Sequence, residues 1–94
     1  MSLAIFWTDD AEVTFDSIVL FIEANWSRKD AETFVKHTQK VIMLIADQPY
    51  MYKASINNDV RQAVITKQTS MFYEVHRDFI TVLYFWDNRQ EPVF

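Results

Sequence analysis

The pattern of hydrophobic residues changes period at Pro49, and this change restricts the chain to folds that combine helices with a sheet. Before Pro49 the apolar residues recur every three or four positions, as they do on one face of an α-helix. After Pro49 they alternate with polar residues in short runs, which is typical of β-strands. The pattern therefore predicts an α+β fold, with helices before Pro49 and most of the strands after it.

Two helices are expected before Pro49. The first begins with Asp9 as its N-cap and Glu12 three positions later, an acidic form of the capping box. It ends near Asn25, a residue type that tolerates the left-handed backbone of a helix cap. Ser27 marks the N-cap of the second helix, and Pro49, which has no backbone N–H, stops it. Because only about two residues separate the helices, they should form an antiparallel hairpin.

Short apolar or alternating runs predict strands on both sides of this hairpin. The expected strands are a buried one at residues 3–7, a short one through Tyr52, Ala54 and Ile56, and three more at 60–67, 71–75 and 79–86. Turns at 57–59, 68–70 and 76–78 join the later strands, so these should form an antiparallel meander. We therefore expect one α+β domain over residues 1–94, with an N-terminal strand, an antiparallel helical hairpin and a three- to four-stranded antiparallel meander.

The distribution of charge argues against a surface built for nucleic acid. The formal net charge is −4, and the first 25 residues contain five acidic side chains and no lysine or arginine. Residues 50–94 contain five charges of each sign. A protein that grips nucleic acid through phosphates carries a basic excess. We therefore do not expect this chain to bind DNA sequence-specifically by itself.

The residue types that are missing exclude several kinds of site. The sequence contains no glycine, which excludes a glycine-rich phosphate loop and a dinucleotide fingerprint. It contains no cysteine, which excludes disulfides and thiolate metal sites. The longest apolar run, Val41–Ala46, is far shorter than the ~20 residues of a membrane span, and no signal peptide opens the chain. We expect a cytoplasmic protein with no cofactor, no metal and no membrane contact.

The order of segments in the second half resembles that of a known family. An arginine opens one strand (VRQAVI, 60–65), a Tyr-x-Val strand follows (FYEV, 72–75), and an aliphatic strand leads into an arginine-containing tail (ITVLYFWDNRQEP, 80–92). In the first half, a Trp-Thr strand end precedes an Ile-Val-x-x-Ile stretch. This combination resembles the RelE/ParE toxins over nearly the whole chain and is closer to their ParE branch.

The resemblance implies a toxin of a type II toxin–antitoxin, or plasmid stabilisation, system. Such toxins are neutralised by a small cognate antitoxin, whose extended or helical segment wraps the toxin. One branch of the family consists of ribosome-dependent mRNA endoribonucleases, and the other is described as poisoning DNA gyrase. DNA gyrase and the ribosome are therefore the two alternative targets.

The resemblance disfavours the ribonuclease mechanism, because expected contributors are missing. Arg61 opens a strand where the ribonuclease branch keeps a basic residue that faces RNA, and it could stabilise charge in a cleavage transition state. The simpler interpretation is a solvent-facing Arg61 paired with a carboxylate such as Glu74. Ser70 stands where that branch has a catalytic arginine, and Ala63 stands where it has a lysine. The sequence also ends at Phe94 without a C-terminal helix to deliver a catalytic tyrosine or histidine.

A ribonuclease activity would have to rely on the remaining cations, which are Arg61, Lys67, Arg77 and Arg89. Tyr73 could transfer a proton, but its spacing suits packing in the sheet.

His37 and His76 lie far apart in different elements and cannot by themselves make a metal site. The acidic group at the start of the first helix suits the helix dipole better than paired catalysis. That group consists of Asp9, Asp10 and Glu12.

Two places could bind a partner protein. Leu20 and Phe21 widen the apolar stripe of the first helix and could form an exposed patch for an antitoxin. Trp86 and Arg89 close the last strand, and Trp and Arg are enriched at binding hot spots. The alternative is that Trp86 completes the core and that Arg89 pairs with a nearby carboxylate.

The sequence therefore predicts a ParE-like toxin that binds a protein target such as DNA gyrase and is held inactive by its antitoxin. The first alternative is a ribosome-dependent mRNA endoribonuclease of the RelE type. The second is a degenerate family member that binds an antitoxin but is no longer toxic.

Overall fold

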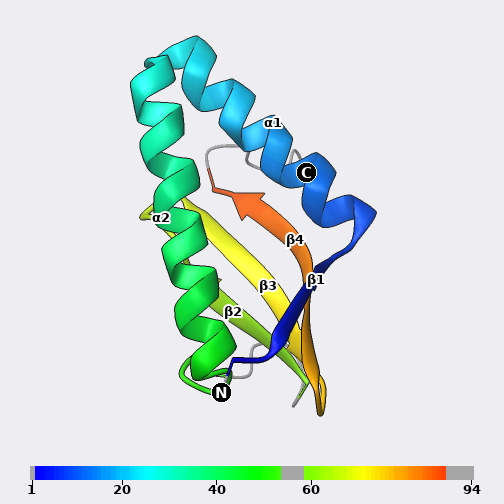
Figure 1. The fold of residues 1–94 in the computed structure, drawn as a ribbon. Helices are drawn as coiled ribbons and strands as arrows, with labels where there is room; N and C mark the ends of the chain where they lie inside the picture. Colours follow the sequence, from blue (N-terminus) through cyan, green and yellow to red (C-terminus); the bar gives the residue numbers. More distant parts are fainter. Residues whose placement is uncertain (1, 54–58, 89–94) are drawn as a thin grey trace.

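The computed structural model describes residues 2–53 and 59–88, which form two helices and four strands (Figure 1). In chain order these are β1 (Ala4–Trp7), α1 (Asp9–Asn25), α2 (Arg28–Asp47), β2 (Val60–Val64), β3 (Thr69–Val75) and β4 (Phe79–Asp87). Figure 1 shows α1 and α2 as a hairpin that lies on one face of the sheet. The expected α+β fold and helical hairpin are confirmed. No helix of the described residues is both long and apolar enough to cross a membrane.

The sheet is mixed, with the strand order β1-β4-β3-β2. β2, β3 and β4 pair antiparallel, which confirms the predicted meander. β1 pairs with β4 in parallel, with Ala4 opposite Phe79 and Trp7 opposite Val82. The sheet as a whole is therefore not antiparallel, because its first strand joins the last one at the edge.

The ends of the helices differ in detail from the prediction. The N-cap of α1 is Thr8 and not Asp9, because the Thr8 hydroxyl accepts from the backbone N–H three residues on at 3.0 Å. Asn25 ends α1 as expected but without a left-handed cap, since no described residue has a positive φ. Its side-chain amide donates to the Phe21 carbonyl oxygen at 2.8 Å instead. Ser27 caps α2 as predicted.

The strands differ from the prediction in three places. The turn before β3 spans residues 66–68, so Thr69 and Ser70, which were expected in that turn, are buried strand residues. Tyr52 lies in a bend rather than a strand, and the rest of that predicted strand lies outside the described residues. β1 is an edge strand with alternating exposure rather than a buried strand, and Phe6 is 57% exposed.

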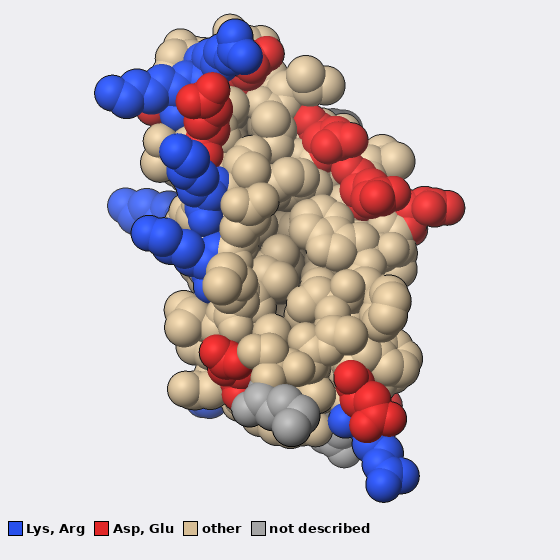
Figure 2. All heavy atoms as spheres, in the orientation of Figure 1, with Lys and Arg blue, Asp and Glu red and all other residues tan. Residues whose placement is uncertain are grey.

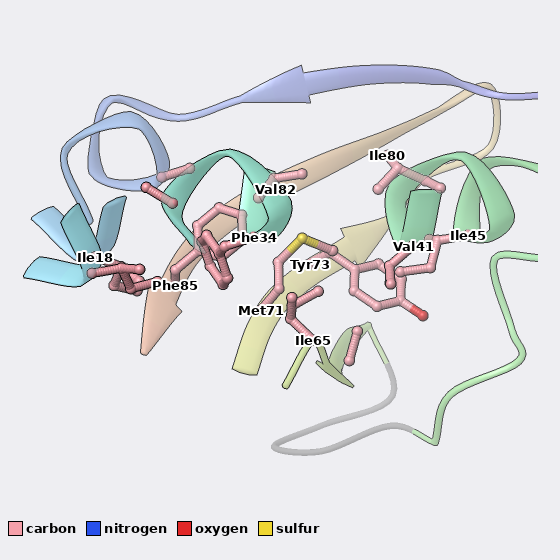
Figure 3. Close-up of a cluster of buried hydrophobic side chains, with 14 residues drawn as sticks. Ile18, Phe34, Val41, Ile45, Ile65, Met71, Tyr73, Ile80, Val82 and Phe85 are labelled. Carbon is pink, nitrogen blue, oxygen red and sulfur yellow. The ribbon is translucent and has the colours of Figure 1, made fainter. Parts of the chain in front are cut away.

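The hydrophobic core lies between the hairpin and the inner face of the sheet (Figure 3). The helices contribute Ile18, Phe34, Val41 and Ile45, and the strands contribute Met71, Tyr73, Ile80, Val82 and Phe85. Three rings join α1, β1 and β4, because the Phe85 ring centroid lies 5.3 Å from that of Trp7 and 5.0 Å from that of Phe15. Burial of these large side chains is the main source of stability in a domain of this size.

Where β4 extends past the end of β1, the side chains of two threonines form hydrogen bonds with its backbone. The Thr8 hydroxyl donates to the Leu83 carbonyl oxygen at 2.5 Å, and the Phe85 N–H donates to the Thr14 hydroxyl oxygen at 2.9 Å. Thr8 precedes α1 and Thr14 lies in its second turn. These contacts satisfy backbone groups of β4 that no strand reaches, and they fix α1 against the sheet.

A register shift in β4 decides which of its residues face the core. Phe72 lies opposite Tyr84, but Tyr73 lies opposite Val82, so Leu83 is one extra residue in β4. Such a bulge reverses the inward and outward alternation that follows it. Phe85 therefore points into the core, and Trp86 points to the other face of the sheet.

Candidate functional site

The face of the sheet opposite the helices, which we call the outer sheet face, gathers aromatic side chains. Strand alternation places on it Phe6, Phe72, Phe79, Tyr84 and Trp86. Within the described part of the chain, both helices cover the other face (Figure 1). The outer sheet face therefore carries an aromatic surface that neither helix covers.

Two neighbouring cross-strand rows form the centre of the outer sheet face, and both lie on the C-terminal side of the bulge in β4. Phe72 and Tyr84 stack with ring centroids 4.7 Å apart and an angle of 20° between their planes. Trp86, which is 42% exposed, lies opposite Ser70, and Ser70 lies opposite Val64 on β2. The alternation of the strands brings these side chains together, because all of them have buried neighbours that face the helices.

Ser70 links the centre of this face to its polar edge. The Gln62 side-chain amide donates to the Ser70 hydroxyl at 3.1 Å, across the β2–β3 pair. This position would carry a catalytic arginine if the chain followed the ribonuclease pattern. Here it holds a small hydroxyl side chain that is 6% exposed. A neutral hydroxyl in this place supplies no positive charge to a phosphate.

The other end of the outer sheet face carries a smaller aromatic group. The His76 ring stacks on Phe79 with centroids 4.3 Å apart, and Phe6 meets Phe79 edge-on at 5.5 Å. Glu74 lies 3.2 Å from the His76 ring nitrogen Nε2. His76 is thus part of a packed surface cluster. In residues 2–53 and 59–88, no three His, Asp or Glu side chains lie close enough together to hold a metal ion.

Arg61 lies on the opposite, helix-covered face and not with the aromatic residues. Its guanidinium donates to the Tyr52 carbonyl oxygen and lies 4.8 Å from the centroid of the Tyr50 ring. The predicted pairing of Arg61 with Glu74 is therefore wrong, because Glu74 faces the other side of the sheet and contacts His76. Arg61 ties the segment after α2 to the start of β2.

Tyr73 is the cross-strand neighbour of Arg61 and is fully buried. Its hydroxyl donates to the Pro49 carbonyl oxygen at 2.9 Å. Burial raises the pKa of Tyr73 to about 12, against the opposing effect of the nearby Arg61 charge. Tyr73 is therefore neutral at physiological pH and packs in the core, as its spacing in the strand indicates.

Of the cations that a ribonuclease would need, the three that the structure describes do not converge. Lys67 lies in the turn between β2 and β3, and Arg77 lies in the turn between β3 and β4. These turns are at opposite ends of β3, whose seven residues span about 23 Å. Arg61 lies on the helix side, and Arg89 lies outside the described residues.

The predicted partner residues divide between two faces of the molecule. Leu20 is 64% exposed on the outward side of α1, whereas Phe21 is half-buried and packs on Trp26 with ring centroids 5.7 Å apart. Trp86 lies on the outer sheet face. Leu20 and Trp86 therefore do not belong to one contiguous surface patch. The role of each as a partner contact stays a prediction.

Sequence reasoning missed the stacked pair of Phe72 and Tyr84 as part of a site. The outward direction of Phe72 could have been predicted from the sequence. Its neighbours Met71 and Tyr73 are large apolar residues that suit the core, and successive residues of a strand point to opposite faces. The direction of Tyr84 depends on the bulge at Leu83, for which the sequence has no signal.

Comparisons with known proteins agree with this architecture. The family model of the ParE toxin of the type II toxin–antitoxin system parDE matches residues 5–92. A comparison with curated protein sequences gives no match.

Solved structures of the same fold include three bacterial toxins. A chain from the chromosomal ParDE toxin–antitoxin system of P. aeruginosa superposes with a TM-score of 0.77 at 16% identity, over 92% of this chain and 96% of that chain. A copper-bound mutant toxin from Helicobacter pylori gives 0.66 at 15% identity, over 96% and 99%. The YoeB dimer from Staphylococcus aureus gives 0.63 at 13% identity, over 89% and 94%.

Proposed function

Because this chain belongs to the ParE toxin family of type II toxin–antitoxin systems, we propose that it acts by binding DNA gyrase through its outer sheet face. In this proposal the toxin works as a stoichiometric inhibitor of a protein target. Its cognate antitoxin holds it inactive until the antitoxin is lost. The choice of gyrase rests on the resemblance to the ParE branch.

The observation that carries the proposal is the chemistry of the outer sheet face. Trp86, Tyr84 and Phe72 form a contiguous aromatic surface on a rigid sheet. Trp and Tyr are the residues that most often dominate the binding energy of protein interfaces, because they bury a large area with little loss of side-chain freedom. Such a surface suits a protein partner.

The same surface is poorly suited to cleaving RNA. A cleavage site needs cations that converge on the developing phosphate charge, and a general acid or base within reach of the attacked bond. The central residues of the outer sheet face are Gln62, Ser70, Phe72, Tyr84 and Trp86, and none of them is a cation. This composition supports a binding role over a ribonuclease role.

A supercoiling assay with purified DNA gyrase tests the proposal. The wild-type chain should inhibit supercoiling or trap cleaved DNA, and Trp86→Ala should weaken the effect by about tenfold or more, as expected for a hot-spot residue. Trp26→Ala is the matched control, since Trp26 is 56% exposed at the apex of the helical hairpin and does not lie on the outer sheet face. This variant should inhibit as the wild type does.

Two results would overturn the proposal. One is the absence of any effect on gyrase at a large excess of toxin. The other is equal loss of activity in Trp86→Ala and Trp26→Ala with both proteins folded, which would exclude the outer sheet face as the contact. Cleavage of mRNA on ribosomes by the purified chain would establish the ribonuclease alternative instead.

A further inference from the structure

The outward face of the helical hairpin carries an acidic row on α1 and a predominantly basic row on α2. Figure 2 shows Asp and Glu side chains along α1, and mostly Lys and Arg side chains along α2, with an uncharged strip between them. α2 also has three exposed acidic residues, Asp30, Glu32 and Asp47. α1 contains no lysine or arginine. The exposed acidic row consists of Glu12, Asp16 and Glu23, and the exposed basic row consists of Lys29, Lys36 and Lys40.

Among the described residues, no ion pair within 4 Å joins the two rows in one molecule. In the described part of the chain, the only ion pair on the hairpin joins Arg28 to Glu32 at 3.6 Å, and both residues belong to α2. Asp16 and Lys36 thus face solvent on different helices. Charges of both signs remain available to an external partner.

The two rows have matching spacing when they are measured from the apex of the hairpin. Glu23, Asp16 and Glu12 lie about 3, 14 and 20 Å along α1 from its end at Asn25. Lys29, Lys36 and Lys40 lie about 2, 12 and 18 Å along α2 from its start at Arg28. Each acidic residue is therefore level with one lysine, to within the reach of a lysine side chain.

An exposed apolar residue and a hollow lie at the same level. Leu20 projects from α1 about 8 Å from the apex end. A hollow of about 400 Å³ between the helices is lined by Val19, Ala31 and Val35, with charged side chains around it. Ala31 and Val35 lie about 5 and 11 Å along α2 from its start, so they bracket the level of Leu20.

We propose that two copies of this chain associate through this face, with α1 of each copy lying against α2 of the other. A two-fold axis in the interface that runs along the hairpin brings each acidic row onto the partner's basic row at the same level. It also directs Leu20 of each copy toward the hollow of the other. A two-fold axis that lies in the interface but runs across the hairpin is excluded, because it would place the acidic rows of the two copies against each other.

The size of this face predicts a weak dimer. α1 is about 25 Å long, and two packed helices are about 20 Å wide, so each copy buries about 500 Å². A total of about 1,000 Å² is at the low end for specific interfaces. The dimer should therefore depend on protein concentration and weaken at high salt, because its ion pairs are exposed to solvent. The outer sheet face stays free in both copies.

Sedimentation equilibrium of charge-reversal variants of the full chain tests the proposal. The wild type should dimerise with rising concentration, and Lys36→Glu or Asp16→Lys alone should weaken dimerisation by about tenfold or more, since each variant opposes like charges twice. An equimolar mixture of the two variants should form heterodimers, because both Asp16–Lys36 contacts then become complementary. The double variant should dimerise with itself.

Lys67→Glu is the matched control, because it makes the same charge change in the turn between β2 and β3, outside both charged rows of the hairpin. Its dimerisation should equal that of the wild type, and circular dichroism should show that every variant is folded. A wild type that stays monomeric at high micromolar concentration would overturn the proposal. So would a mixture of the two variants that associates no better than either variant alone.

Discussion

Tyr73 is the largest fully buried side chain, and its hydroxyl has one partner, the Pro49 carbonyl oxygen at 2.9 Å. This contact fixes the chain where it leaves α2. Tyr73→Phe leaves the carbonyl oxygen without its donor and should lower the free energy of unfolding by about 1–2 kcal/mol. Urea denaturation measures the change. An unchanged free energy of unfolding would contradict a structural role for the hydroxyl.

The same residue predicts a specific loss of stability in alkaline solution. Burial raises the pKa of Tyr73 from 10.0 to about 12. Between these values the unfolded chain releases the proton while the folded chain keeps it, so the free energy of unfolding falls as the pH rises. Tyr73 contributes up to about 1.4 kcal/mol per pH unit to this fall. Urea denaturation at pH 10, 11 and 12 should show a smaller fall for Tyr73→Phe than for the wild type.

Replacing Arg61 tests whether this side chain stabilises the fold or contacts the target. Its guanidinium holds the Tyr52 carbonyl oxygen and the Tyr50 ring, so Arg61→Ala should lower the free energy of unfolding by about 1–2 kcal/mol. Below the melting temperature of the variant, gyrase inhibition should be unchanged. Thermal denaturation and the supercoiling assay measure the two effects. Loss of inhibition by a folded Arg61→Ala protein would show that the residue contacts the target.

The sequence predicted that Arg61 opens a strand, but it could not give the direction of the side chain. That direction follows from the pairing of Arg61 with Tyr73, which faces the core. Arginine is usually found on the solvent side of a strand, so residue type suggested the wrong face. The long aliphatic stem of Arg61 allows it to lie along the core while its charged group reaches backbone oxygen.

At the level of the elements, the two helix caps should differ in their contribution to stability. The Thr8 hydroxyl both caps α1 and donates to the Leu83 carbonyl oxygen, whereas the Ser27 hydroxyl contacts only groups of Asp30. Thr8→Ala should therefore cost about 2–3 kcal/mol and Ser27→Ala about 1 kcal/mol. Denaturation of both variants measures the difference.

Thr8→Ser is the control for this comparison, since it keeps the hydroxyl and removes one methyl group. It should recover most of the stability that Thr8→Ala loses. Equal destabilisation by Thr8→Ala and Ser27→Ala would mean that the contact with β4 adds nothing to the cap.

The sequence predicted the helices more accurately than the strands for a physical reason. Helix ends are encoded locally, by Ser27 at the start of α2 and Pro49 just past its end. The edge position of β1 and its parallel pairing with β4 depend on contacts between distant segments. The bulge at Leu83 depends on the packing of Phe85 and Tyr84 on opposite faces, which no neighbouring residue type indicates.

At the scale of the molecule, two adjacent residues of β4 should behave in opposite ways. Phe85 is 2% exposed and joins α1, β1 and β4, so Phe85→Ala should cost about 3–5 kcal/mol. A loss of this size approaches the total stability of a domain of this length. Trp86→Ala, on the outer sheet face, should cost much less. Thermal denaturation distinguishes them, and similar losses would contradict the assigned faces.

The family could be predicted from the sequence, because the order of short motifs along the chain is preserved even where each motif is weak. The candidate site could be predicted only in part. Trp86 was a candidate, but the stacked pair beside it was not, and the three described cations of the ribonuclease alternative do not come together. A site made by side chains from three strands depends on their register, which the sequence does not encode locally.

The parallel pairing of β1 with β4 has a consequence for synthesis on the ribosome. β1 is made first, yet its partner residues, Phe79–Val82, are made more than seventy residues later. Until they emerge, the nascent chain can form the hairpin but has no strand to accept β1, and β3 lacks its central neighbour. Pairing between such distant segments is slow compared with helix formation. The outer sheet face is therefore completed only after β4 has emerged from the ribosome.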